Sequence, residues 1–394
     1  MMTQNKGKFF GSILIVIGTS VGGGMLALPM LSAATGFLRA SILLLSLWAL
    51  MATTALLVLK INLTLPKYKN SFSSMASTCL GWRGKLLASF SCMLLLYSLT
   101  AAYISGGASL LTNALNELHI QVPIWITAVL FVIILGGAIF WSTKATDHLN
   151  RGLISIKGFL LSMSLVFIAP HIDITLLFHS HAKSPTQYLW TAVPIFLCSF
   201  GFHTVIPSIR NYIGDKPQEL KTIILSGTLV TFTIYLLWLA ASLGTIPSAS
   251  DHGSSVGEFI NLLSIAANNK WIAFGINGFA NIAITTSFLG VALGLFDFLA
   301  DAFGRSDTRS GRLQTSLLTF IPPLFFALLY PKGFVIALGY AAIFVAILEI
   351  ILPALMAYKL QIWKPTWLII IFMIGITIIS LQIMAGLHLL PTRG

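Results

Sequence analysis

Long apolar segments separated by short polar connections run through the whole chain. A stretch of about 20 apolar residues is long enough to cross the hydrocarbon core of a bilayer as a helix. We find eleven such stretches and expect each to be a membrane-spanning helix, at about residues 9–35, 39–63, 86–112, 122–142, 152–170, 188–211, 222–246, 271–300, 313–331, 334–358 and 366–388. The pattern predicts an all-α integral membrane protein with a single transmembrane domain over residues 1–394.

The first span contains an unusual run of glycines, Gly18-Thr19-Ser20-Val21-Gly22-Gly23-Gly24. A glycine inside a helix costs about 1 kcal/mol relative to alanine. In hydrocarbon an opened backbone also finds no water to hydrogen-bond. Taken alone, the run is compatible with close helix packing through small residues. It is equally compatible with a break that exposes backbone groups to a ligand in the middle of the membrane.

The sixth span carries a similar interruption, with the sequence Phe196-Leu197-Cys198-Ser199-Phe200-Gly201-Phe202-His203-Thr204-Val205-Ile206-Pro207. A proline follows the glycines in both spans, Pro29 in the first and Pro207 in the sixth. Because four spans lie between the two helices, they cross the bilayer in opposite directions. Interrupted spans at corresponding places in two halves are typical of transporters built from inverted repeats. The pairing therefore favours helix breaks in both spans.

The composition agrees with a membrane protein and changes the meaning of the charge. Of the 394 residues, 57% are apolar and 9% are charged, whereas soluble domains carry about 25% charged residues. The net charge of +12 reflects Lys and Arg clustered between apolar segments, where they set topology, so no nucleic-acid partner is expected. The cysteines Cys79, Cys92 and Cys198 have no motif spacing, which argues against a disulfide framework and a zinc site.

The distribution of Lys and Arg predicts the orientation. With a cytoplasmic N-terminus, 18 of the 23 Lys and Arg residues fall in segments on the inner side and 5 on the outer side. Basic residues accumulate in cytoplasmic connections. Lys6 and Lys8 lead directly into the first span without a cleavage site for a signal peptide. We therefore expect that the first span is retained, with the N-terminus inside and the C-terminus outside.

Three motifs resemble those of the bacterial hydroxy and aromatic amino acid permeases. They are Gly18-Thr19-Ser20-Val21-Gly22-Gly23-Gly24-Met25-Leu26-Ala27-Leu28-Pro29, Ser199-Phe200-Gly201-Phe202-His203 with Val205-Ile206-Pro207-Ser208, and Thr286-Ser287-Phe288-Leu289-Gly290-Val291 with Gly294-Leu295-Phe296-Asp297-Phe298. The resemblance extends over the whole chain in length, span count and motif order, and is nearest to the tyrosine/tryptophan branch. The family belongs to the amino acid–polyamine–organocation superfamily.

The resemblance implies a five-plus-five inverted repeat, the leucine-transporter-like fold. Its repeats would cover about residues 9–170 and 188–358, with discontinuous first and sixth helices and an extra C-terminal helix at 366–388. It implies a secondary active transporter, not an enzyme, in the bacterial cytoplasmic (inner) membrane. Such a protein would import an aromatic amino acid, tyrosine or tryptophan, by proton symport with alternating access. The expected partners are this substrate and the lipid bilayer, with protons as coupling ion, no cofactor and no obligate protein partner.

Three alternatives remain open at this point. One is a carrier of serine, threonine or another neutral amino acid, with sodium as coupling ion. Another is a multispan membrane enzyme such as a lipid-modifying transferase, which would need converging catalytic groups. The charged side chains here are too sparse and scattered for that. The third is a sensor that binds its ligand without translocation.

The expected substrate is a zwitterion, and the helix breaks offer groups for both of its charges. The N-terminus of a half-helix presents free N–H groups and a partial positive charge to a carboxylate. Glycine lets a ligand approach the backbone closely. We assign the carboxylate to Gly22, Gly23 and Gly24. For the ammonium, we expect backbone carbonyls or hydroxyls as acceptors, at Thr19, Ser20, Ser199 and Phe200. The Thr19 and Ser20 hydroxyls can instead bond to their own helix.

The side-chain pocket should be apolar and aromatic with few polar groups. Phe200 and Phe202 flank Gly201 in the sixth span, and His203 follows directly. We also count Gly201 among the substrate-binding candidates. Two tyrosines lie near the middle of the third span. For a phenol-bearing substrate, a polar partner is expected on the eighth span. Because the chain has 27 phenylalanines, any one of them can be a core or lipid-facing residue instead. The further candidates are Tyr97, Tyr103 and Asn281, the last in a row with Asn277 and Thr285.

Coupling to protons requires a titratable group inside the membrane. Lys157 lies in the fifth span. In a related proton-coupled transporter, a lysine of this span occupies the place of a sodium ion, which here implies neighbours near Val21, Thr286 and Ser287. A lysine at this depth can instead extend its amine to the cytoplasmic surface.

Two further titratable residues lie deep in the spans. His203 lies inside the sixth-span break, and an imidazole changes charge close to physiological pH. It can also cap freed backbone or contact substrate. Glu349 lies in the tenth span, where a lone carboxylate must be protonated or paired. Asp297 lies nearer the end of its span and is expected to pair with a basic loop residue. An outer connection holds His171, Asp173, His179 and His181, which we interpret as a solvated loop and not as a metal site.

Overall fold

The computed structural model describes residues 2–66, 71–178, 185–246 and 253–390, and these ranges contain helices and no strands. The α-helices are α1 Met2–Ser20, α2 Ala27–Thr35, α3 Phe37–Thr64, α4 Phe72–Glu117, α5 Ile124–Trp141, α6 Thr143–Ile168, α7 Ile174–Phe178, α8 Pro185–Ser199, α9 Ile206–Ile213, α10 Pro217–Thr245, α11 Val256–Ala266, α12 Lys270–Ala302, α13 Arg309–Leu329, α14 Phe334–Ala346, α15 Leu352–Lys359 and α16 Pro365–Gly386. Short 3-10 segments are η1 Gly23–Leu26, η3 Ala169–His171 and η4 His203–Val205, and η5 Ile347–Ile351 is a π-helix.

Within the described ranges, ten continuous segments are long and apolar enough to cross a membrane, and a bent pair of helices makes an eleventh. The bent pair is the first span, in which Gly7–Ser20 and Gly23–Thr35 meet at 51°. The sequence-based prediction of an all-α membrane protein with eleven spans is therefore confirmed. The third span begins earlier than expected, because α4 includes a short helix that precedes a kink at Gly81.

The first span is interrupted at its glycines. Helix α1 ends at Ser20, Gly22 is extended with φ −139° and ψ −157°, and η1 and α2 continue the span. Pro29 lies in the first turn of α2, where a missing N–H leaves no helical hydrogen bond unmade. The expected break of this span is present.

The sixth span is interrupted in the same way. Helix α8 ends at Ser199, Phe200–Phe202 are non-helical, and η4 and α9 continue the span. Pro207 lies in the first turn of α9, as Pro29 does in α2.

The tenth span contains an irregularity that was not predicted. The π-helix η5 separates α14 from α15 and contains Glu349. Pro353 has no N–H to donate to the carbonyl of Glu349, four residues earlier. The loss of that hydrogen bond favours the wider π turn, and such turns occur frequently at functional sites.

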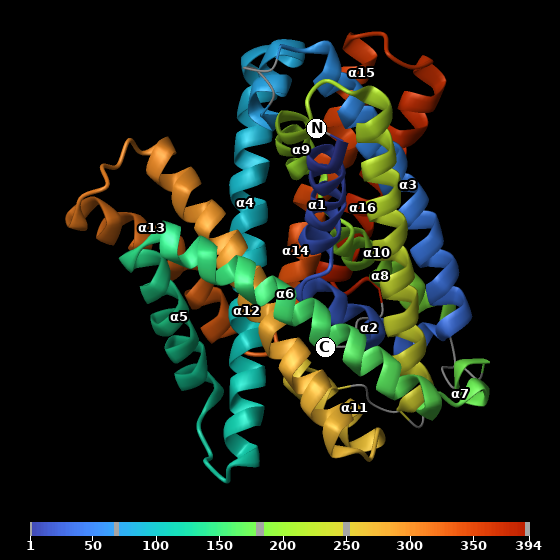
Figure 1. The fold of residues 1–394 in the computed structure, drawn as a ribbon, viewed down its shortest axis with the longest axis vertical. Helices are drawn as coiled ribbons and strands as arrows, with labels where there is room; N and C mark the ends of the chain where they lie inside the picture. Colours follow the sequence, from blue (N-terminus) through green and yellow to red (C-terminus); the bar gives the residue numbers. More distant parts are fainter. Residues whose placement is uncertain (1, 67–70, 179–184, 247–252, 391–394) are drawn as a thin grey trace.

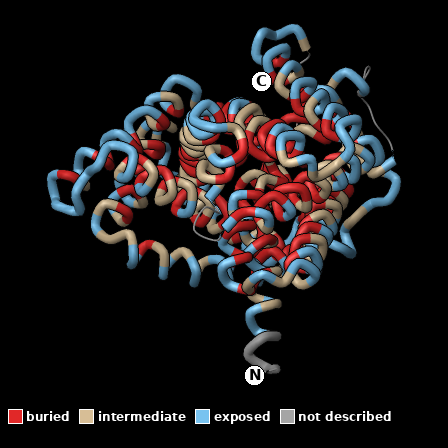
Figure 2. Tube along the Cα trace, turned by 90° about the horizontal axis from the view of Figure 1, so that it is seen from above, coloured by how far each residue is buried: buried red, intermediate tan, exposed pale blue. Residues whose placement is uncertain are grey.

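The spans pack around a buried centre. Figure 1 shows α5 and α13 on one side of the long helix α4, with α1, α10 and α3 on the other, while α6 and α12 pack against each other. Figure 2 shows buried residues gathered in the middle of the bundle and exposed residues around its rim. Many rim residues are large and apolar, among them Leu14, Ile133, Ile134 and Ile369. A rim of this kind suits a hydrocarbon surrounding.

The connection between the seventh and eighth spans contains helix α11, which the sequence did not predict. Ser255 caps its N-terminus by accepting a hydrogen bond from the backbone N–H of Glu258. The backbone N–H of Gly257 donates to the Ser109 hydroxyl of α4 at 3.1 Å. Glu258 also forms an ion pair, at 3.2 Å, with Lys332 in the connection between α13 and α14. These contacts hold α11 against the bundle.

The close approach of α11 to α4 gives a testable prediction. A Cβ at Gly257 would lie 2.4 Å from the carbonyl oxygen of Ser109, and backbone cannot rotate away as a side chain can. We expect Gly257→Ala to lower stability by about 1–3 kcal/mol, as overpacking does, and to lower the melting temperature in detergent. Gly137→Ala is the control, because nothing lies within 4 Å of its added Cβ. Equal melting temperatures for both variants would contradict this packing.

Candidate functional site

The two helix breaks lie side by side in the buried centre. The Ser199 hydroxyl, at the end of α8, donates to the Gly24 carbonyl oxygen in η1 at 3.2 Å. Ser199 and Phe200 are 4% and 1% exposed. The structure thus brings together the glycines of the first span and the Ser199–His203 segment of the sixth, as their joint assignment to one site requires.

Tyr235 of α10 joins the two breaks. Its hydroxyl oxygen lies 2.6 Å from the Ser20 carbonyl oxygen and 2.6 Å from the Ser199 carbonyl oxygen. These carbonyls are at the C-terminal ends of α1 and α8, where a helix carries partial negative charge. The Tyr235 side chain is fully buried and its ring packs against Phe200 with centroids 5.2 Å apart. A hydroxyl has one proton to donate, so the two carbonyls share it.

Sequence reasoning missed Tyr235. A single tyrosine in an apolar span is no motif, and nothing in the local sequence says which helix face turns inward. The one available signal was the presence of a hydroxyl in the middle of the seventh span.

Side chains of α4 and α12 lie close to Gly22 and Gly23 in the first break. The backbone N–H of Gly23 donates to the Ser287 hydroxyl of α12 at 2.9 Å. A Cβ at Gly22 would lie 2.6 Å from that hydroxyl oxygen, and a Cβ at Gly23 would lie 2.8 Å from the ring of Tyr103 and from the side chain of Ile284. These two positions therefore need glycine, because α4 and α12 approach the backbone itself.

Aromatic side chains surround the breaks. Tyr103, Phe200 and Phe202 are 7%, 1% and 1% exposed. Tyr103 contacts the space beside Gly23, and Phe202 packs against the His203 ring with centroids 4.9 Å apart. The structure thus brings these three predicted residues to the breaks.

Lys157 extends inward and not toward a membrane surface. Its Nζ donates to the Val21 carbonyl oxygen at 2.6 Å, and the residue is 4% exposed. The expected neighbour Val21 is thus in contact, and Ser287 bonds to Gly23 two residues further on. The Thr286 hydroxyl instead donates to the Ala283 carbonyl of its own helix at 3.1 Å.

His203 and Glu349, assigned separately from the sequence, lie in contact. The His203 Nδ1 is 2.7 Å from the Glu349 Oε2, and the His203 Nε2 is 2.8 Å from the Thr54 hydroxyl of α3. Thr54 was not predicted. The contact answers the requirement that a lone carboxylate in a span be paired or protonated.

Several predicted residues are not brought to the breaks by their side chains. The Thr19 and Ser20 hydroxyls bond to the carbonyls of their own helix, at Ile15 and Val16. Asn281 is exposed and donates to the Asn277 carbonyl, also in its own helix.

Three other assignments concern the periphery. The Tyr97 hydroxyl donates to the Leu318 carbonyl of α13 at 2.9 Å, away from the breaks. Asp297 lines a polar pocket with Arg312 of α13, whose ion pair is with Asp307, so its pairing with a basic loop residue stays a prediction. Of the histidine loop, His179 and His181 lie outside the described residues, while His171 is exposed.

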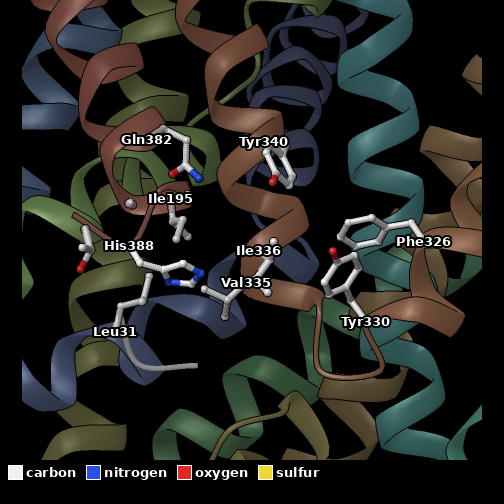
Figure 3. Close-up of a pocket in the computed structure, with 12 residues that line it drawn as sticks. Leu31, Ile195, Phe326, Tyr330, Val335, Ile336, Tyr340, Gln382 and His388 are labelled. Carbon is white, nitrogen blue, oxygen red and sulfur yellow. The ribbon is translucent and has the colours of Figure 1, made fainter. Parts of the chain in front are cut away.

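A cavity of about 270 Å³ lies at the end of the bundle opposite the N-terminus. Figure 3 shows its lining, in which Tyr330, Gln382 and His388 lie among apolar side chains from α2, α8 and α14. None of the residues predicted from the sequence lines it. The breaks themselves are covered by their aromatic neighbours, so this conformation is closed over them.

The fold and the paired breaks define the class of protein. Half-helices whose free ends meet in the middle of a membrane are the mark of secondary transporters. The chain resembles the structure of Mhp1, a nucleobase-cation-symport-1 family transporter, in a closed conformation with bromovinylhydantoin bound. The TM-score is 0.60 at 14% identity, over 98% of this chain and 94% of that one. The two therefore share the leucine-transporter-like fold, as predicted; the boundaries of the repeats stay a prediction.

The chain belongs to the tryptophan/tyrosine permease family, whose model matches residues 5–389. It is 34% identical to a tryptophan-specific transport protein of Pseudomonas aeruginosa, over 98% of this chain and 97% of that protein. It is also 34% identical to the tyrosine-specific transport system 2 of Haemophilus influenzae, over 92% and 90%. The protein is thus a multi-pass membrane transporter and not an enzyme, and the family inferred from the motifs is confirmed.

The bridging hydroxyl of Tyr235 gives a testable prediction about stability. Tyr235→Phe leaves two buried helix-end carbonyls without a donor, and an unsatisfied buried group costs about 1–3 kcal/mol. We expect a lower melting temperature in detergent. Tyr97→Phe is the matched control, because its hydroxyl also donates to one carbonyl but is half-exposed and water can replace it. If both variants melt together with the wild type, the bridge does not stabilise the breaks.

Proposed function

We propose that this protein imports an aromatic amino acid, tyrosine or tryptophan, across the bacterial cytoplasmic membrane by proton symport with alternating access. The observation that carries the proposal is the meeting of three half-helix ends at the Tyr235 hydroxyl and the glycines of the first span. The names of the relatives, specific for tryptophan or tyrosine, support the substrate class.

An amino acid fits the chemistry of these ends. Its carboxylate would bind at the N–H groups of Gly22, Gly23 and Gly24, at the positive end of η1. Its ammonium would bind at the carbonyls of Ser20 and Ser199, in place of the Tyr235 hydroxyl.

The walls around these groups favour an aromatic side chain. Tyr103, Phe200 and Phe202 offer ring faces and edges, which pack well with aromatic rings. A serine or threonine would leave most of this apolar surface without a partner. Aromatic selectivity therefore rests on these three residues.

Two contacts favour protons over sodium as the coupling ion. Broken spans hold sodium with carbonyls and the C-terminal ends of half-helices. Here the Val21 carbonyl binds the Lys157 ammonium, and the Ser20 and Ser199 carbonyls bind the Tyr235 hydroxyl. A sodium ion would have to displace these side chains, and the lysine cation would repel it. A proton leaving Lys157 would turn a charge-assisted hydrogen bond to Val21 into a weaker neutral one and so loosen the first span, which links proton release to opening.

Transport can be measured directly in proteoliposomes. We expect labelled tyrosine or tryptophan to accumulate under an inwardly directed proton gradient without sodium. Unlabelled aromatic amino acids should compete, and serine should not. Uptake that ignores the proton gradient and requires sodium would overturn the coupling, and competition by serine alone would overturn the substrate class.

A variant of Lys157 separates coupling from binding. Lys157→Gln keeps an amide donor for the Val21 carbonyl but cannot carry a proton. We expect exchange of internal for external substrate to continue, while proton-driven accumulation above the external concentration is lost. Lys144→Gln, an exposed lysine of the same helix, is the control and should accumulate as the wild type does. Full accumulation by Lys157→Gln would remove this lysine from the coupling.

A further inference from the structure

Three polar side chains from three spans meet beside the sixth-span break. They are Thr54 of α3, His203 of η4 and Glu349 of η5, which are 0%, 0% and 2% exposed. Each comes from a different part of the sequence, and together they connect the broken span to two continuous ones. We call them the Thr54–His203–Glu349 cluster. Groups this polar and this buried require an account of their hydrogen bonds and protons.

The Thr54 hydroxyl defines one of the protons on the imidazole. It donates to the Met51 carbonyl oxygen, three residues earlier in the same helix, at 3.2 Å. A hydroxyl has a single proton, so toward His203 it acts as an acceptor. With the hydroxyl proton directed to the Met51 carbonyl, the hydrogen of the 2.8 Å contact is placed on the Nε2 of His203.

The other ring nitrogen defines the second proton. The His203 Nδ1 lies 2.7 Å from the Glu349 Oε2, at the short end of hydrogen-bonding distances. With Nε2 protonated, a neutral ring would direct its Nδ1 lone pair toward a carboxylate at this distance. One further proton, on either atom, turns that repulsion into attraction. A proton shared by these two atoms would remove the repulsion and leave the pair without net charge.

The pair is also incompletely satisfied. Among the described residues, neither the His203 Nδ1 nor the Glu349 Oε2 has a hydrogen bond of good alignment. The second carboxylate oxygen accepts the backbone N–H of His203 at 3.3 Å. Glu349 therefore caps the start of the second half of the sixth span, where a negative group is favoured. The π-helix η5 carries the carboxylate to that place.

The elements around the cluster bring few ionisable groups to it. Cys198 of α8 interacts electrostatically with Glu349, and α16 has no ionisable side chain over Pro365–Gly386. Other ionisable groups of the packed elements are engaged elsewhere or lie far along their helices, among them Tyr103 of α4 at Gly23, Tyr235 of α10 at Ser20, Tyr340 of α14 at the cavity, Lys60 of α3 at the Ile362 carbonyl, Tyr97 of α4 at the Leu318 carbonyl, Arg210 of α9 at Asp215, and Lys359 at the end of α15.

We propose that the Thr54–His203–Glu349 cluster is a proton-binding site that holds the broken sixth span against the tenth while it is protonated, and releases that span when the proton leaves. It rests on the proposed function for its place in a proton-driven cycle. When the shared proton passes to water, the pair keeps a buried negative charge and opposed lone pairs, so His203 and Glu349 separate. The first break is held by Lys157 and the second by this cluster, which gives each broken span its own proton.

The linkage of stability to pH tests the site without substrate. The folded cluster keeps a proton that an unfolded chain loses above about pH 6.5, where free histidine titrates. The folded state then binds more protons than the unfolded state, so stability falls as pH rises. Melting temperatures of the purified protein in detergent, measured between about pH 6 and pH 9, report this loss.

Glu349→Gln removes the second proton acceptor and keeps a neutral, hydrogen-bonding amide. Measured against the wild type, its melting temperature should fall less with rising pH, by about 5 °C over this range. Asp297→Asn, which neutralises an exposed acid of α12, is the matched control and should follow the wild type. A Glu349→Gln curve parallel to that of the wild type would overturn the proposal.

Thr54→Val keeps the proposal testable where Glu349→Gln does not fold. It removes the acceptor of the Nε2 hydrogen and leaves His203 and Glu349 in place. The imidazolium form is then less favoured, so the fall in melting temperature should end at a lower pH and be smaller than in the wild type. A fall of unchanged size and range would overturn the proposal.

The two failures are distinguishable because melting requires no substrate. A wild type that transports no aromatic amino acid, but shows the expected pH dependence and its loss in Glu349→Gln, would overturn the proposed function alone. A wild type that transports as proposed, with pH dependence unchanged in Glu349→Gln, would overturn the cluster alone.

Discussion

Two spans broken in the middle of a bilayer leave backbone groups that no water satisfies, and the centre of this protein is arranged around that constraint. Side chains from four other spans supply the partners. Tyr235 serves the carbonyls at the ends of α1 and α8, Lys157 serves the first-break carbonyl of Val21, Ser287 accepts from a glycine N–H, and Glu349 accepts from the start of the second half of the sixth span. These partners satisfy the backbone groups that the two breaks leave open and so stabilise the breaks.

The same arrangement explains how broken helices can serve transport. A side chain that satisfies a backbone group can be replaced by a ligand that satisfies the same group equally well. The ammonium of an amino acid is such a ligand for the carbonyls that Tyr235 now bridges. Lys157 and the Thr54–His203–Glu349 cluster can in addition lose protons, so their hold on the two breaks depends on proton supply. In the closed conformation, side chains of the protein occupy the helix-end carbonyls of Ser20 and Ser199.

The fold and the breaks were predictable from the sequence because the bilayer imposes strong rules. Eleven apolar stretches became eleven spans, and glycine with a following proline identified both interruptions. The inward direction of Lys157 was one of two open alternatives, and the contact with Val21 decides it.

The partners within the site were less predictable. Tyr235 and Thr54 have no local signature, because contacts between spans 149 to 215 residues apart depend on which helix faces pack together. Asn281 shows the converse, a residue predicted at the site that does not lie there. Helical spacing placed it in a polar row, yet Asn281 is exposed and bonds along its own helix.

The most direct test of the central claim is an experimental structure of the protein with tyrosine or tryptophan bound. We predict that the ligand carboxylate lies at the N–H groups of Gly22–Gly24 and its ammonium at the carbonyls of Ser20 and Ser199. The Tyr235 hydroxyl should then be displaced from one or both of these carbonyls. Ligand bound in the cavity lined by Gln382 and His388, with the Tyr235 bridge intact, would contradict it.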